Sequence, residues 1–125
     1  MSCSACSDKA PVTLVYSCSG AADVGEIADR AARSLVREGF GKMSCAVGVG
    51  AGVQSLRNGA LSAGRVVAID GCATGCVSKA MTESGVTGIV HIELGSLGFP
   101  KGQSPASPEN VERAIAAIRA KAALA

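Results

Sequence analysis

The 125-residue sequence has very few aromatic residues: two phenylalanines, one tyrosine and no tryptophan. It also lacks a block of basic residues, and its formal net charge is only +2. Proteins that bind nucleic acid need a basic surface, and those that bind single strands also stack aromatic side chains on bases. We therefore expect no nucleic-acid partner.

Long apolar runs are missing too. No stretch reaches the roughly 20 apolar residues that a membrane-spanning helix needs. The first ten residues, MSCSACSDKA, lack the basic and then apolar order of a secretory signal. We therefore expect no membrane partner and a cytoplasmic location.

Strand-like and helix-like segments alternate along the chain. Strands are predicted over residues 11–17, in the segment 42–52, over 65–70 and over 88–94, because these runs are apolar and bounded by glycine-containing turns. Helical periodicity follows each of them. In the first helix Asp23 and Glu26 are expected to form a capping box and Gly39 to end the helix; in the last, Ser107 caps and Pro108 opens it.

This alternation predicts the α/β fold class: a single three-layer, doubly wound domain over residues 11–125. Its four-stranded sheet is expected to be mainly parallel, in the order 2-1-3-4 of Rossmann-like and flavodoxin-like folds. Residues 1–10 are expected to form a flexible N-terminal arm that carries Cys3 and Cys6.

Six cysteines are the most informative residues present. In a reducing compartment they indicate metal binding or catalysis more often than disulfides. Cys18, Cys45 and Cys72 each follow a predicted strand, so they should lie at the carboxyl edge of the sheet, where open parallel sheets bind ligands. Cys76 follows Cys72 by four residues and would share its helical face if the helix began near Cys72. Four thiols at one edge suit tetrahedral zinc.

Three segments carry a family resemblance: CSGAADVG after the first strand, GKMSCAVGVG at the second, and VVAIDGCATGC followed by HIELG at the third and fourth. From about Val12 to Gly95 the sequence resembles the DGC-domain family, and the triplet Asp70-Gly71-Cys72 is its most specific part. The resemblance implies a zinc site. It implies as ligands the four cysteines that match the family pattern: Cys18, Cys45, Cys72 and Cys76.

Other interpretations of the cysteines stay open. A thiol–disulfide redox enzyme would use Cys72 and Cys76, although such enzymes usually have two intervening residues rather than three. Four cysteines also suit an iron–sulfur cluster. A phosphatase loop is not supported, because Val24 stands where a phosphate-binding arginine belongs.

Enzymatic activity has little other support in the sequence. Serine, glutamate and lysine residues form no recognisable nucleophile–base set. Asp70 is expected to accept backbone N–H groups in the turn that it forms with Gly71, and His91 to be a structural residue of a strand. The expected function is zinc binding in metal sensing, storage or delivery, with a metal-exchange protein as a possible partner. Cys3 and Cys6 are a possible transfer arm, and an interaction module with structural zinc is a further alternative.

Overall fold

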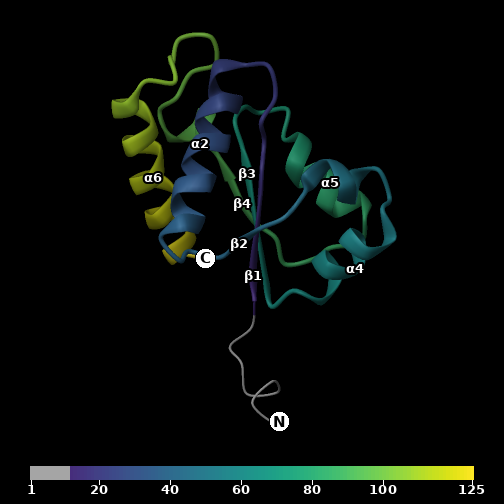
Figure 1. Cartoon of the computed structure of the whole chain (residues 1–125). Helices are drawn as coiled ribbons and strands as arrows, with labels where there is room; N and C mark the ends of the chain where they lie inside the picture. Colours follow the sequence, from purple (N-terminus) through teal and green to yellow (C-terminus); the bar gives the residue numbers. More distant parts are fainter. Residues whose placement is uncertain (1–11) are drawn as a thin grey trace.

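The computed structural model describes residues 12–125, and a four-stranded parallel sheet forms its centre (Figure 1). The strand order is β2-β1-β3-β4, as predicted. All neighbouring pairs are parallel. The strands are β1 (Thr13–Ser17), β2 (Lys42–Met43), β3 (Arg65–Asp70) and β4 (Val90–Glu93). In Figure 1 their carboxyl ends point toward the top of the picture.

Helices cover both faces of the sheet, which makes three layers (Figure 1). One face carries α2 (Asp23–Arg37) and α6 (Pro108–Ala123), and these two helices pack against each other. The other face carries α3 (Ala46–Gly50), α4 (Gln54–Ser62) and α5 (Cys76–Glu83). A short 3-10 helix, η1 (Leu94–Leu97), continues directly from β4. The predicted α/β class is confirmed.

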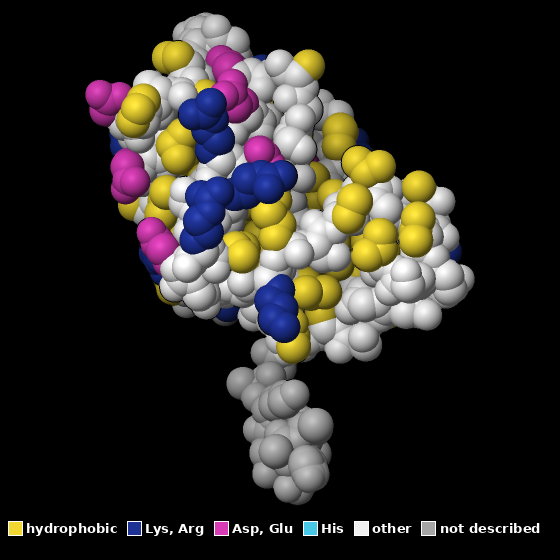
Figure 2. All heavy atoms as spheres, in the orientation of Figure 1, with side chains coloured by type: hydrophobic (Ala, Val, Ile, Leu, Met, Phe, Trp, Pro, Cys, Tyr) yellow, Lys and Arg dark blue, Asp and Glu magenta, His cyan; other side chains and the backbone are white. Residues whose placement is uncertain are grey.

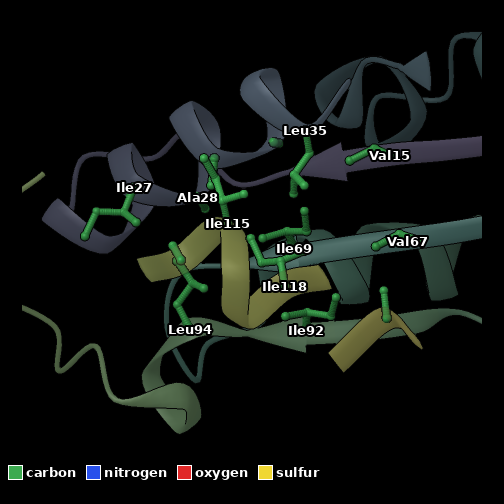
Figure 3. Close-up of a cluster of buried hydrophobic side chains, with 14 of the residues drawn as sticks. Val15, Ile27, Ala28, Leu35, Val67, Ile69, Ile92, Leu94, Ile115 and Ile118 are labelled. Atoms are coloured by element: carbon green, nitrogen blue, oxygen red, sulfur yellow. The ribbon is translucent and has the colours of Figure 1, made fainter. Parts of the chain in front are cut away.

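Alternating side chains of the strands build two hydrophobic cores. Val15, Val67 and Ile69 face α2 and α6, where they meet buried side chains such as Leu35 and Ile118 (Figure 3). The residues between them, including Tyr16 and Ala68, face α3, α4 and α5. Because β3 is buried on both faces, its sequence has a continuous apolar run, as is typical of strands in parallel sheets.

The second strand is shorter than predicted. Only Lys42 and Met43 pair with β1, and residues 46–50 form helix α3 instead of continuing the strand. Cys45 caps this helix by accepting the backbone N–H of Gly48, and a Cβ at Gly48 would collide with the Leu56 side chain of α4. Gly48 therefore allows close helix packing, whereas Gly52, with a φ of 81°, turns the chain after α3.

Helix ends agree with the sequence signals in two cases and differ in a third. Ser107 accepts the backbone N–H of Asn110 with Pro108 at the first helical position, and Gly39 has a φ of 91° just beyond α2. The capping box at the start of α2 is wrong, because Ala22 is the N-cap and Glu26 pairs with Arg30 on the helix surface.

The surface in Figure 2 shows Lys and Arg side chains over the region of α2 and a group of hydrophobic side chains over the α3–α5 layer. Val47, 80% exposed, belongs to that layer. Among residues 12–125, no helix has the length and apolar character needed to cross a membrane.

Candidate functional site

The carboxyl edge of the sheet carries a cysteine after each of three neighbouring strands. Cys18 follows β1 directly, and its backbone N–H donates to the carbonyl of Ile69 at 2.8 Å, so the β1–β3 pairing extends to this cysteine. Cys45 lies two residues beyond β2 and caps α3. Cys72 lies two residues beyond β3, and Cys76 is the first residue of α5. The predicted strand-end placement of the three cysteines is confirmed.

Backbone amides point at two of these sulfurs. The N–H of Gly20 donates to Cys18 Sγ at 3.4 Å, and the N–H of Gly48 donates to Cys45 Sγ at 3.2 Å. Such bonds stabilise a sulfur that carries negative charge more than a neutral one. A backbone N–H dipole therefore faces the sulfur of each of these two cysteines.

The Cys72 thiol has its own stabilising groups. Hydrogen bonds from the side chain and backbone N–H of Thr74 lower the pKa of this thiol. Burial opposes them more weakly, and the ammonium of Lys101 adds a further, smaller lowering of the pKa. The thiolate is the form that binds metals and attacks disulfides. Cys72 is half-buried, whereas Cys76 is exposed.

Cys72 and Cys76 do not share a helical face. Residues 72–75 form a turn, closed by a hydrogen bond of 3.1 Å from the N–H of Gly75 to the carbonyl of Cys72. Gly75 has a φ of 65°, a left-handed conformation that a glycine adopts without strain. The helix begins only at Cys76, so the spacing of four residues does not place the two side chains on one helical face.

The four cysteines share one edge but do not form a closed cluster in this conformation. Within residues 12–125, no three Cys, His, Asp or Glu side chains are close enough together to hold a metal ion. The strand register gives the reason. If it is continued beyond the paired residues, Cys45 lies about one residue position before Cys18 along the strand direction, and Cys72 lies about two positions after Cys18. At about 3.3 Å per residue this separates Cys45 from Cys72 by roughly 10 Å along the strands. The donor types fit zinc, whereas their present spacing does not.

Asp70 organises the turn between β3 and α5. The residue is 1% exposed, and its carboxylate accepts the backbone N–H groups of Val77 at 2.8 Å and Ser78 at 3.1 Å. It also contacts His91 Nε2 at 2.8 Å. The sequence correctly indicated that Asp70 accepts backbone N–H groups, and the structure adds that it caps α5 from across the turn.

Gly71 is required by close packing. A Cβ at this position would lie 2.7 Å from the backbone carbonyl carbon of Val24 in α2. The turn after β3 therefore passes directly over the first turn of α2. The Asp70-Gly71-Cys72 triplet thus combines a helix cap, a close backbone contact and a strand-end thiol.

Asp23 ties the loop before α6 to this same edge. Its carboxylate accepts the backbone N–H groups of Gly102 and Ser104, both at 2.9 Å. Lys101, beside Cys72, belongs to this loop. Because the partners are about 80 residues apart in sequence, no local pattern could have identified the contact.

Asp23 predicts a pH dependence of stability. The hydrogen bonds from Gly102 and Ser104 hold the pKa of Asp23 below its ordinary value of 3.8. A carboxyl group whose pKa is depressed in the folded state contributes stability above its unfolded pKa, and this contribution is lost as the pH falls through the folded value. We expect Asp23→Asn to be less stable than the unchanged chain at pH 7 and the difference to shrink below about pH 3.8.

Urea unfolding of both chains at pH 7, 5 and 3 measures this difference. Glu109→Gln, in the first turn of α6, is the control for loss of an exposed carboxylate. A difference between the Asp23→Asn variant and the unchanged chain that is the same at all three pH values would contradict the assigned role of Asp23.

The fold and this edge define the class of protein: a doubly wound, parallel α/β domain with a cysteine-bearing carboxyl edge. The family model described as the DGC domain matches residues 14–118, which include all four edge cysteines and the Asp70-Gly71-Cys72 triplet. The chain belongs to the DGC-domain family.

One relative is the anaerobic and virulence modulator AnvM of Pseudomonas aeruginosa. It is 36% identical to this chain over 91 residues, which cover 73% of this chain and 70% of the relative. No solved structure matches the chain.

Proposed function

We propose that this protein binds one zinc ion through Cys18, Cys45, Cys72 and Cys76. The observation that carries the proposal is the placement of all four thiols beyond the ends of three adjacent strands. Four cysteine sulfurs form a common tetrahedral zinc site. Bound zinc would supply a soft cation that draws these sulfurs together.

The surrounding groups would prepare the sulfurs for this role. The amides of Gly20 and Gly48 compensate negative charge on Cys18 and Cys45, while Thr74 and Lys101 do so for Cys72. Binding requires the turns beyond the strands to move toward one another, because no three of the sulfurs now meet within the described residues. The strands themselves can stay in place, since both hydrophobic cores lie between sheet and helices.

Elemental analysis of the chain purified in reducing buffer tests the proposal. We expect about one zinc per chain, released by a strong chelator together with the appearance of four titratable thiols. Iron with visible absorption would indicate a cluster instead, and a metal-free chain that does not take up added zinc would refute the proposal.

The biological use that we propose is metal sensing, storage or delivery in the cytoplasm. A site that must close around its ion suits exchange better than permanent binding, because opening the turns exposes the ligands. The name of the P. aeruginosa relative, a modulator, is in keeping with a regulatory use. A purely structural site is distinguishable, since chelation would then unfold the domain.

A thiol redox function is the second candidate, and the lowered pKa of Cys72 favours it. Its partner in a disulfide would be Cys76, at the other end of the same turn. Mass spectrometry after mild oxidation separates the candidates. A Cys72–Cys76 disulfide that forms readily in a chain that never takes up zinc would favour the redox enzyme.

The N-terminal cysteines lead to a separate prediction about rate. Cys3 and Cys6 lie outside the described residues, and we propose that they capture or hand over the ion. Removal of residues 1–10 is expected to leave the zinc content near one per chain and to slow transfer to a competing chelator, because two fewer thiols are available as exchange ligands.

The transfer is measured at low zinc in reducing buffer, with the double variant Cys3→Ser, Cys6→Ser as the matched control for arm length. Equal transfer rates in all three chains would show that the arm has no part in exchange. Loss of bound zinc on truncation would show that the four-ligand assignment is wrong.

A further inference from the structure

A cavity of about 520 Å³, widely open to solvent, lies beside the cysteine-bearing edge, on its β4 side. Three segments line it: the turn with Cys72 and Thr74, the start of η1 with Glu93 and Ser96, and the loop with Lys101. The carboxyl ends of parallel strands are the usual place for small-molecule sites, and this volume is within their ordinary range. Of the residues that line it, Cys72 alone is a proposed zinc ligand.

The cavity wall carries two charges of opposite sign that do not pair with each other. Among the ion pairs formed by residues 12–125, neither Glu93 nor Lys101 takes part. Their charged groups are therefore more than 4.0 Å apart, although both line the same hollow. A ligand with one positive and one negative group would satisfy both.

Different parts of the fold surround these two charges. The Glu93 carboxylate lies against Gly95, and a Cβ at position 95 would collide with it. The glycine therefore leaves space for this carboxylate. The backbone around Lys101 is fixed by the two hydrogen bonds that Gly102 and Ser104 donate to Asp23. Glu93 thus has free space beside Gly95, and the Lys101 ammonium lies on a fixed backbone segment close to the Cys72 thiol.

We propose that this cavity binds a small zwitterion, an α-amino acid or a dipeptide, with its carboxylate at Lys101 and its ammonium group at Glu93. The ligand is held by charge-assisted hydrogen bonds, which are stronger than neutral ones. Its side chain lies toward Cys72 and Thr74, so the ligand covers one side of the Cys72 thiol.

Titration of the isotope-labelled full chain by NMR tests the proposal with L-serine and glycyl-L-serine as probes. We expect saturable shifts at residues 72–74, 93–96 and 100–102. The same probes with the amine acetylated or the carboxylate converted to an amide should bind at least about 10-fold more weakly, because each loses one charged contact. Absence of saturable shifts there, or equal binding of the blocked probes, would overturn the proposal.

Charge-neutral variants locate the contacts. Lys101→Gln and Glu93→Gln should each weaken binding at least about 10-fold. Lys121→Gln and Glu83→Gln, at the C-terminal ends of α6 and α5, remove the same charges near the opposite edge and should have no effect. Unchanged affinity in the first pair of variants would contradict the site.

Two further measurements separate this proposal from zinc binding. Cys72→Ser removes a proposed zinc ligand and keeps both charges, so it should still bind the zwitterion. In the unchanged chain, the probe should slow alkylation of Cys72 and leave that of Cys45, on the other side of β1, unaltered. Equal protection of both cysteines, or of neither, would show that the ligand does not occupy this cavity.

Discussion

Replacing Cys72 by serine is expected to abolish stable zinc binding while the sheet remains folded. A hydroxyl is a much poorer zinc ligand than a thiolate, and the pKa of the Cys72 thiol is lowered by its neighbours Thr74 and Lys101. Changes to groups that only orient a ligand cost about 10–100-fold in metal affinity, so loss of a ligand itself should cost at least 100-fold. Zinc affinity is measured by competition with a chromophoric chelator.

The fold should survive because the cores do not depend on the metal. Cys72 is only half-buried, and the side chains beneath it, such as Ile69 and Ile92, stay packed. Circular dichroism should therefore keep its helix and strand signals. Cys6→Ser, which changes a cysteine that is not among the four proposed ligands, is the matched control and should retain its zinc. Undiminished affinity in Cys72→Ser would remove this residue from the ligand set.

Replacing Asp70 by alanine is expected to cost about 2–4 kcal/mol in the free energy of unfolding. The change leaves the N–H groups of Val77 and Ser78 without their acceptor and removes the contact to His91. Unsatisfied buried donors cost about 1–3 kcal/mol each, and loss of a helix cap has a similar effect. Urea unfolding at neutral pH measures the difference.

His91→Ala is the matched control, because it breaks only one of the three contacts of Asp70. The His91 side chain is 40% exposed, so water can replace this contact, and we expect a loss below about 1 kcal/mol. If both variants lost the same stability, Asp70 would act through His91 rather than as the cap of α5. An Asp70→Ala chain as stable as the unchanged one would contradict the capping role altogether.

Local sequence signals predicted most of the fold. The third strand was predicted with its observed bounds, since an unbroken apolar run between glycines is typical of a strand buried on both faces. The parallel sheet followed from the alternation of elements, and the observed strand order is the one typical of doubly wound, flavodoxin-like folds. The prediction of a strand over residues 42–52 was wrong from residue 46 onward, where helix α3 forms. A glycine can mark a turn or allow two helices to pack closely, and only the contact with Leu56 shows that Gly48 does the second.

The candidate site could be predicted in its composition but not in its spacing. Placement of cysteines after strands follows from the sequence pattern, whereas their relative height depends on where each strand ends. The register of β2 against β1 places Cys45 level with Ser17, and the turn at Gly75 separates Cys72 from the helix of Cys76. The contact of Asp23 with residues 102 and 104 could not be predicted for another reason: its partners are far apart in sequence, and no local pattern indicates such a hydrogen bond.

X-ray absorption at the zinc edge tests the central claim most directly, because it reports the ligand atoms of the bound ion. We expect a single zinc environment of four sulfur atoms at about 2.3 Å in the full chain. We expect the same environment after removal of residues 1–10. A shell that contains nitrogen or oxygen atoms, or four sulfurs that persist when Cys18 and Cys72 are both replaced by serine, would contradict zinc binding by this edge.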